Sequence, residues 1–413
     1  MSGLAGGAAA QTPLTWTEVR ARFVANNPTL QAGQMTIDES RADEVTAFLR
    51  PNPQATGIAD VINIFKSPEG SGVFDNTLIA GSVGYLYERQ HKRDLRRDSA
   101  VGATTIASSS QADLVRTLTS TLRAAFVQLL QAKAFLTLAQ DELADYDQVL
   151  AVSRDRLAAG DIAQIDLDRL VLQRVQYESD IQTAQVNLRT AKIQLLGLLN
   201  DHTTPVDQFD VSGQYDFAPP APSLDEVRQT ALDTRPDLKA AVQAIDKAKT
   251  DHRLAIANGS ADPTFSVDVG WPQQPFDYSP PVTAYIGASV SFPLRIFDKN
   301  QGEKLKTQID ITRNERLADA SRTQVFTDVD TAYASVLSTI ALLQPYRDTY
   351  LDQSTRVRDT MTFSYQNGGA SLIDFLQARQ DYRSVQIAYV NLIASYLNAV
   401  NQLNLAVGQE VIP

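Results

Sequence analysis

The sequence predicts a mainly helical α+β fold that is built as two tandem repeats. Three observations predict it: one residue pattern occurs twice, two long stretches carry few helix breakers, and short segments alternate apolar and polar residues. Alternation with a period of two is typical of strands, and apolar residues spaced by three and four are typical of helices. We therefore expect long antiparallel helical hairpins together with a small number of strands.

The repeat relates positions that lie 208 residues apart. The matching pairs include Pro28 and Pro236, Leu30 and Leu238, Gly160 and Gly368, and Asp166 and Asp374. A period this long indicates a duplicated half-molecule and not a solenoid. We divide the chain into a flexible tail at 1–13, a first repeat at 14–200, a linker at 201–222 and a second repeat at 223–413. The small residues Ala8-Ala9-Ala10 fit either a signal-peptidase site without the usual leader features or a disordered tail.

Composition excludes several classes of function. The net charge of −11 argues against nucleic acid as a partner, and the lack of cysteine excludes disulfides and thiolate chemistry. The mean hydropathy is −0.20, and no run of 18 apolar residues occurs, so we expect no transmembrane helix. The short alternating strands of a membrane β-barrel are compatible with this composition. No nucleophile elbow, phosphate loop or zinc motif is present, and the three histidines are scattered, so we expect no enzyme, no cofactor and no resident metal site.

Each repeat is predicted to open with a helix, at about 15–49 and 223–257. Pro28 and Pro236 lie inside these patterns and should kink or interrupt them. Ser223 and Glu226 have the spacing of a capping box. Helices of about 60 residues should follow at 94–157 and 299–365, each ending at a glycine before a second helix returns. The first return helix has a seam with alternating three- and four-residue spacing, typical of coiled coils. Arg174 is its one polar member, and the others are Leu167, Leu170, Tyr177, Ile181, Ala184, Leu188, Ala191, Leu195 and Leu198. In the second return helix all ten positions that lie 208 residues later are apolar or aromatic: Phe375, Ala378, Tyr382, Val385, Tyr389, Leu392, Tyr396, Ala399, Leu403 and Ala406.

Two hairpins are predicted between these helices. In the second repeat, apolar residues alternate with polar ones over 265–271 and 282–292, and the first repeat has counterparts near 54–65 and 76–87. Four such strands are too few to close a barrel, for which about eight are needed. An open sheet edge is not tolerated in hydrocarbon. If the strands lie in a membrane, several copies of the chain must contribute to one barrel.

The order of the motifs resembles one family over essentially the full length. The motifs are Asn27-Pro28-Thr29-Leu30, Arg235-Pro236-Asp237-Leu238, Ser291-Phe292-Pro293-Leu294 and the two helical turns at 156–166 and 365–374. Together they resemble the TolC-like outer membrane efflux proteins, and the first repeat is most similar to the heavy-metal export branch. The resemblance implies a homotrimer in the bacterial outer membrane, with a twelve-stranded barrel and a twelve-helix tunnel through the periplasm. It also implies two protein partners, a periplasmic adaptor (membrane fusion) protein and an inner-membrane pump.

The resemblance also assigns roles at the turns between the long helices. Asp374 matches an aspartate that rings the closed periplasmic entrance in the family, and Asp166 is its counterpart in the first repeat. Gln377 stands where the family has a second acid. The alternative for both aspartates is stabilisation of a helix amino terminus. The turns themselves match the family's adaptor-docking tips, namely Gly160, Gly368, Leu157, Ala159, Tyr365 and Asn367.

Aromatic and basic residues near the strands are candidates for contact with outer membrane lipid. Interfacial girdles of a barrel are aromatic, and the candidates are Trp271, Tyr278, Tyr285, Tyr85 and Tyr87. Simple packing within the strands is the alternative. A run of arginine and lysine at 89–97 should meet anionic headgroups or form a solvated, partly paired helix start.

The predicted function is a passive outer membrane exit duct for a tripartite efflux system, gated at its helical tips. Two alternatives stay open. One is a duct for protein secretion or for drugs in place of metal ions, because the tunnel wall need only be polar. The other is an elongated coiled-coil scaffold without a pore.

Overall fold

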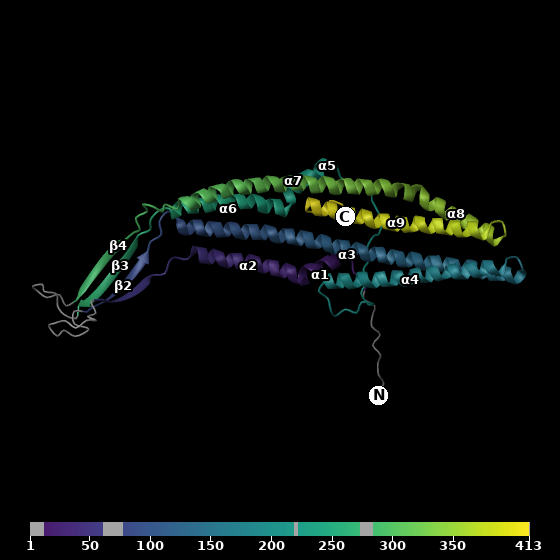
Figure 1. Cartoon of the computed structure of the whole chain (residues 1–413), viewed down its shortest axis with the longest axis horizontal. Coiled ribbons are helices and arrows are strands. Elements are labelled where there is room, and N and C mark those ends of the chain that lie inside the picture. Colours follow the sequence, from purple (N-terminus) through teal and green to yellow (C-terminus); the bar gives the residue numbers. More distant parts are fainter. Residues whose placement is uncertain (1–11, 61–76, 219–221, 273–283, 413) are drawn as a thin grey trace, which may run out of the picture. The chain divides into compact units, whose positions relative to one another are not determined.

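The computed structural model describes residues 12–60, 77–218, 222–272 and 284–412 (Figure 1). Helices dominate, and four strands form one sheet. The helices of the first repeat are α1 (Trp16–Asn26), α2 (Pro28–Phe48), α3 (Lys92–Ala159) and α4 (Gln164–Leu198). Those of the second are α5 (Leu224–Thr234), α6 (Pro236–Asn258), α7 (Gln301–Pro345), the π-helix η1 (Tyr346–Tyr350), α8 (Leu351–Gln366) and α9 (Leu372–Val407). The predicted tail and both turns between paired strands lie largely outside the described residues.

The opening helices are interrupted where the sequence predicts. Asn27 and Arg235 are extended, and the proline that follows each one begins the next helix. Proline suits this place because the first turn of a helix leaves its N–H groups without helical partners. The predicted capping box at Ser223 is confirmed, and its counterpart at Thr15 has the same two-way hydrogen bonding.

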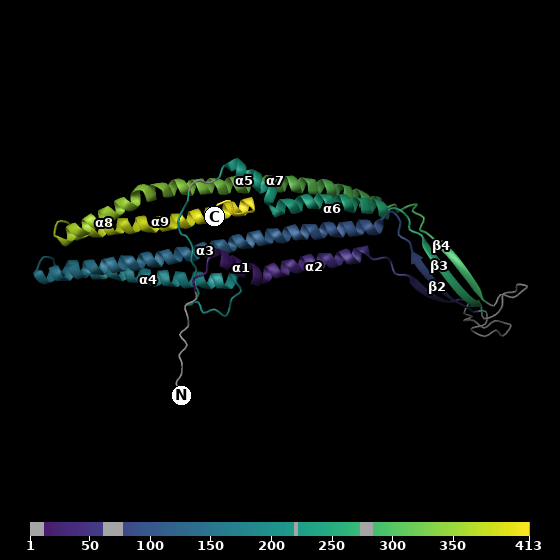
Figure 2. The same ribbon diagram turned by 180° about the vertical axis from the view of Figure 1, so that it is seen from behind.

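The long helical hairpins are confirmed with one difference. Helix α3 runs without a break for 68 residues, which corresponds to a length of about 100 Å. Its counterpart was predicted to be continuous, but it is divided into α7, η1 and α8. The division falls at Pro345, which lacks the N–H that the helix ladder needs, and the next turn is a π-helix. In both views α4 runs beside α3 and α9 runs beside α8 (Figure 1, Figure 2).

The apolar seams of the return helices lie in the core. Leu170, Tyr177 and Leu195 of α4 are buried, as are Phe375 and Leu403 of α9. Three clusters of buried side chains hold the helices together, and aromatic rings recur in them: Tyr146 packs on Tyr177 at 4.7 Å between ring centroids.

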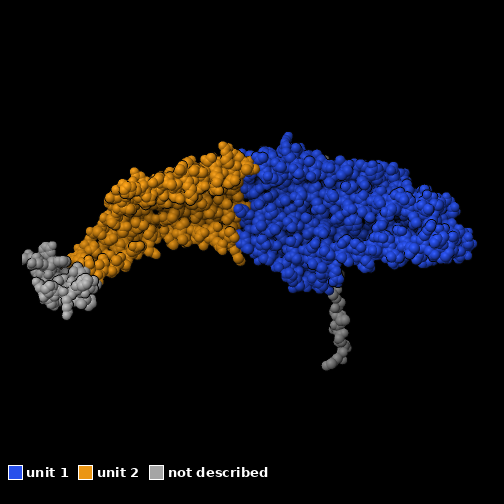
Figure 3. All heavy atoms as spheres, in the orientation of Figure 1, with its two compact units in different colours: residues 1–34, 110–238, 321–413 blue, residues 35–109, 239–320 orange. Residues whose placement is uncertain are grey.

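The chain forms two compact units that cut across the two repeats (Figure 3). Unit 1 comprises residues 1–34, 110–238 and 321–413, and unit 2 comprises residues 35–109 and 239–320. The three buried clusters all lie in unit 1. Unit 2 has a small core: its buried hydrophobic side chains among the described residues are Ile37, Ala80, Ala248, Ala255, Ala257 and Ala318.

The sheet belongs to unit 2 and joins one hairpin from each repeat. Its strands are β1 (Gln54–Asp60), β2 (Leu78–Leu86), β3 (Thr264–Pro272) and β4 (Tyr285–Ser291). They are antiparallel throughout, in the order β1-β2-β3-β4. Among the described residues β1 and β4 are edge strands, so the sheet is open on both sides.

One helix, α3, satisfies a length and hydropathy test for crossing a membrane, contrary to our expectation from the sequence. Its best window of 18 residues has a mean hydropathy of 1.2, and 33% of that window is buried inside the protein. The sequence lacks an uninterrupted apolar run, but a high average does not require one. Because buried core helices pass the same test, this single segment is weak evidence for a spanning helix.

Candidate functional site

On one face of the sheet every residue is glycine, aliphatic or aromatic, and we call this side the apolar face. Directly paired residues of antiparallel strands lie on the same face, so the register assigns every residue to a side. The apolar face consists of Ala55, Gly57, Ala59, Ile79, Gly81, Val83, Tyr85, Phe265, Val267, Val269, Trp271, Ile286, Ala288 and Val290. Several of its large side chains are half exposed or more, including Val83, Val267 and Ile286. Among the described residues of unit 2, no helix covers the sheet in either view (Figure 1, Figure 2).

The opposite side, the polar face, carries every serine, threonine, aspartate and glutamine of the four strands. Asp268 is paired with Gly287, and a carboxylate oxygen of Asp268 lies 2.5 Å from the place that a β-carbon at Gly287 would take. The ring of Tyr285 likewise lies over its partner Gly270. The two glycines therefore leave room for the side chains of Asp268 and Tyr285 to reach over the neighbouring strand.

The predicted interfacial aromatics separate between the two faces. Trp271 and Tyr85 lie on the apolar face, and Tyr87 follows β2 with 57% of its surface exposed. Tyr285 is different, because its register puts it on the polar face and not among the apolar residues. Alternation within the strand already separates Tyr285 from Ile286, but alternation does not say which of the two sides faces outward. Tyr278 lies outside the described residues.

The predicted tips are tight turns that glycine makes possible. Gly160 has a φ of +83° and Gly368 a φ of +75°, a region that glycine alone enters without strain. Ala159 and Asn367 are exposed and Leu157 is half-buried. Tyr365 is buried, because its ring stacks on Phe375 at 4.8 Å between centroids. That ring belongs to the packed interior of the tip and is not available as a docking surface.

The predicted gate residues lie in the first turns of the two return helices. Asp374 is exposed, and its carboxylate accepts a hydrogen bond of 2.7 Å from the hydroxyl of Ser371, the residue that caps the amino terminus of α9. Asp166 is half-buried, 4.0 Å from Arg169. Gln377 is exposed and donates to Asp381 at 2.8 Å. Their capping and helical contacts account for their positions, and the gate role stays a prediction.

A set of ion pairs near the tips was not predicted from the sequence. Arginines of α8 and α9 meet acids of α3 and α4; the pairs are Arg358–Asp145, Arg379–Glu142 and Arg383–Asp180. These pairs join the first helical hairpin to the second, and such contacts are not encoded in local spacing. The sequence does contain a sign of these ion pairs. Arg379 and Arg383 are four residues apart, so they share one side of α9 beside its apolar seam.

The Arg379–Glu142 pair is the most buried of these pairs. The two side chains are 3% and 5% exposed, and the guanidinium and carboxylate are 3.6 Å apart. Glu142 Oε2 and Arg379 Nε lack hydrogen-bond partners among the described residues. Burial raises the pKa of Glu142, and the nearby Arg379 opposes this effect.

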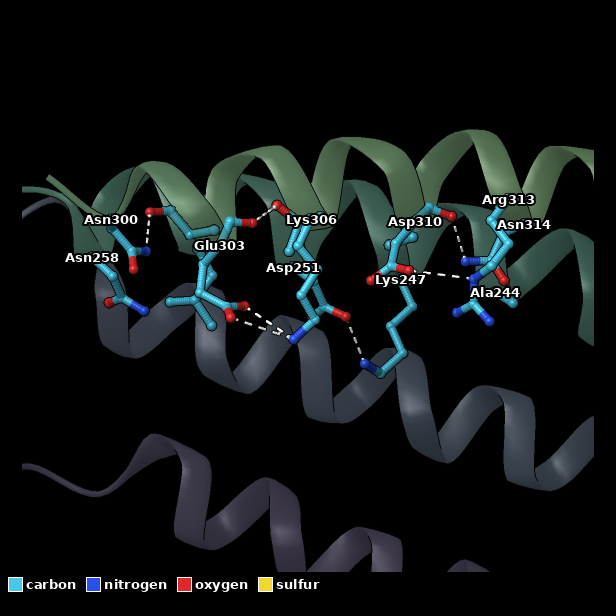
Figure 4. Close-up of a pocket in the computed structure, with 14 residues that line it drawn as sticks. Ala244, Lys247, Asp251, Asn258, Asn300, Glu303, Lys306, Asp310, Arg313 and Asn314 are labelled. Atoms are coloured by element: carbon cyan, nitrogen blue, oxygen red, sulfur yellow. Dashed lines mark hydrogen bonds and ion pairs between the residues drawn. The ribbon is translucent and has the colours of Figure 1, made fainter. Parts of the chain in front are cut away.

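Two further features bear on ligand binding. Among the described residues, no group of three or more histidine, cysteine or acidic side chains is arranged to hold a metal ion. A groove of about 490 Å³ lies between α6 and α7 in unit 2 (Figure 4). Its charges neutralise one another in three pairs: Lys247–Asp251, Lys306–Glu303 and Arg313–Asp310. The groove therefore has no charge preference for a ligand.

Comparisons with known proteins agree with this architecture. Residues 227–409 match the family model described as "Outer membrane efflux protein". The chain is 23% identical over 403 residues to the cobalt-zinc-cadmium resistance protein CzcC of Cupriavidus metallidurans, covering 96% of this chain and 90% of that protein.

Solved structures share the fold over nearly the whole chain. A CusC structure aligns with a TM-score of 0.75 at 18% identity, covering 98% of this chain and 96% of CusC. VceC of Vibrio cholerae aligns with a TM-score of 0.74 at 16% identity, covering 96% and 97%. At these identities the structural likeness concerns the fold.

Proposed function

Because this chain belongs to the TolC-like family of outer membrane efflux channels, we propose that three copies assemble into the passive exit duct of a tripartite efflux system. The family places the chain in the outer membrane and makes it a channel, not an enzyme. The proposal adds the number of copies, the gate, the partners and the cargo.

The two-faced sheet is the observation that carries the proposal. Its apolar face suits contact with hydrocarbon, and its polar face suits a water-filled interior. Open edges at β1 and β4 would leave backbone groups unpaired in lipid, where water cannot satisfy them. Pairing β4 of one copy with β1 of the next removes both edges, and three copies supply twelve strands.

The helical hairpins would form the periplasmic part of the duct. The tip turns at Gly160 and Gly368 would be the end that docks onto an adaptor protein, with an inner-membrane pump supplying the energy. A ring of three Asp374 carboxylates would narrow the entrance and attract cations. Opening would be a shift of one packed hairpin against its neighbours.

Heavy-metal ions are the cargo that we favour. CzcC is named as a cobalt-zinc-cadmium resistance protein, and the chain aligns with nearly all of it. Deleting the channel from its host should sensitise the cells to these metals more than to drugs. A drug-only phenotype would favour the other cargo class.

The duct predicts a particular behaviour of the purified chain. We expect it to require detergent, to have three times the chain mass by light scattering, and to conduct ions in a planar bilayer. A monomer that stays dissolved without detergent would contradict the duct and favour a scaffold.

The gate is tested by Asp374→Ala. Removing three carboxylates from a narrow entrance should relax it, so we expect a higher single-channel conductance. Asp225→Ala is the matched control, because it removes an acid with a 95% exposed side chain on α5, away from the tips. Equal conductance for both variants and the unmodified channel would count against the gate.

A further inference from the structure

A pocket in unit 2 lies where β2 ends and α3 begins, and we call it the junction pocket. Its volume is about 550 Å³, and the residues that line it include Arg50, Arg89, Arg93, Tyr85 and Tyr87. Tyr85 belongs to the apolar face, so the pocket adjoins the end of the surface that would contact hydrocarbon.

The pocket is positively charged although the whole chain carries −11. Four cationic side chains and two acids line it, which leaves a net charge of +2. Both acids have cationic or histidine neighbours: Glu88 pairs with Arg96, and Asp94 lies 3.3 Å from the ring of His91. Within the described ranges, no carboxylate pairs with Arg50, Arg89 or Arg93.

The shape of the pocket is fixed by one aspartate from outside it. Asp262, just before β3, accepts a hydrogen bond from the Arg89 backbone N–H at 2.9 Å and one from the Lys92 ammonium at 2.6 Å. These contacts hold Gln90 and His91 in left-handed conformations, with φ values of 58° and 53°. Left-handed backbone at residues other than glycine costs conformational free energy and is concentrated at functional sites. Here the turn holds Arg89 in one position.

Arg93 is positioned in a different way. Its guanidinium lies 4.3 Å from the centroid of the Phe48 ring, a cation–π contact that leaves its N–H groups free to donate elsewhere. Arginine binds phosphate through paired N–H donors, and tyrosine is favoured where hydrocarbon meets headgroups.

We propose that the junction pocket binds the phosphate headgroup of an anionic membrane phospholipid, with the acyl chains lying along the apolar face beside Tyr85. This assignment rests on the proposed insertion of the sheet into a membrane. The unpaired arginines give the pocket a positive charge. That charge favours an anionic lipid over a zwitterionic lipid, which has no net charge. The aromatic side chains favour a lipid over a soluble phosphate ester, because they can contact its acyl chains.

Native mass spectrometry of the full-length channel in detergent tests the assignment. Short-chain phosphatidylglycerol is titrated beside phosphatidylcholine of the same chain length and beside glycerol phosphate. We expect phosphatidylglycerol to bind at least about tenfold more tightly than either of the others, since each basic residue near a membrane surface contributes several-fold.

The triple variant R50Q/R89Q/R93Q should lose that preference by about tenfold or more. R50Q/R89Q keeps Arg93 stacked on Phe48, which guards against a loss of fold, and it should lose a smaller part of the preference than the triple variant. The matched control K249Q/K306Q/R316Q removes three positive charges from α6 and α7 and should keep the preference.

Three outcomes would overturn the assignment: no preference for phosphatidylglycerol, tight binding of glycerol phosphate alone, or equal losses in the two triple variants. Bilayer conductance of the unmodified channel separates this failure from failure of the duct itself. A channel that conducts ions but shows no preference for phosphatidylglycerol would contradict only the lipid-binding role of the junction pocket.

Discussion

At the scale of single residues, the pair of Arg379 and Glu142 is the most deeply buried of the ion pairs in unit 1. Two charges have been removed from water, and the 3.6 Å between them gives no short hydrogen bond in return. Such a pair is weak evidence for stability, but losing one partner leaves an uncompensated buried charge.

Arg379→Met should therefore destabilise the protein by about 3–5 kcal/mol at neutral pH. Burial in the folded state raises the pKa of Glu142 above its ordinary value of about 4.5, so the folded state binds that proton more tightly than the unfolded state. Stability from this group is fully present below about pH 4.5 and is lost as pH rises through the folded pKa. Removing Arg379 should enlarge this effect, so the loss measured by thermal unfolding should shrink on acidification.

The double variant R379M/E142Q is the control for that prediction. It removes both charges and should recover most of the stability at neutral pH. A loss in R379M that is the same at pH 4 and pH 7 would show that the charge of Glu142 is not the cause.

At the scale of elements, local signals predicted the structure well. The capping box at Ser223, the breaks at Pro28 and Pro236, and the turns at the tips each depend on residues close in sequence, where backbone chemistry decides. The π-helix after Pro345 was missed because a proline inside a long helix can kink it, end it or widen one turn, and packing selects among these.

Contacts between elements were also difficult to predict from the sequence. The pairing of Arg379 with Glu142 joins helices more than 200 residues apart in sequence, so the periodicity of one segment does not contain it. By contrast, alternation within β4 already puts Tyr285 on the opposite side from Ile286, and the pairing with β3 agrees.

The tip turn of the second hairpin offers a sharp test of the local argument. Gly368→Ala forces a β-carbon into the left-handed region and should cost about 1–2 kcal/mol per chain. Gly369→Ala is the matched control, because its φ is not positive and the closest atom to a new β-carbon is 3.5 Å away. Hydrogen exchange across residues 364–372 should speed up in the first variant only; equal exchange in both would contradict the turn's dependence on Gly368.

At the scale of the whole molecule, the repeats and the compact units describe different things. The repeats record how the sequence is duplicated, whereas each unit takes pieces of both copies because equivalent hairpins pack side by side. Unit 2 buries mostly alanine and leaves large apolar side chains exposed, among them Val83 and Phe265. A surface of that kind in a native protein marks contact with a membrane or another chain.

The last prediction concerns the two faces of the sheet and their effect on membrane insertion. Val267 lies on the apolar face between Val83 and Ala288, with 55% of its surface exposed. Lysine on the lipid face of a barrel costs about 2–4 kcal/mol at the membrane midplane, and three copies would multiply that cost. We therefore expect Val267→Lys to reduce insertion into bilayers severely while circular dichroism reports unchanged helix content.

Ser266→Lys places the same charge one residue away, on the polar face. In a water-filled interior that lysine stays hydrated, so insertion should be retained and the preference for cations over anions should fall. Reversal potentials in a salt gradient measure this preference, and flotation with liposomes measures insertion. If both variants insert equally well, the apolar face does not contact lipid, and the barrel built from it is wrong.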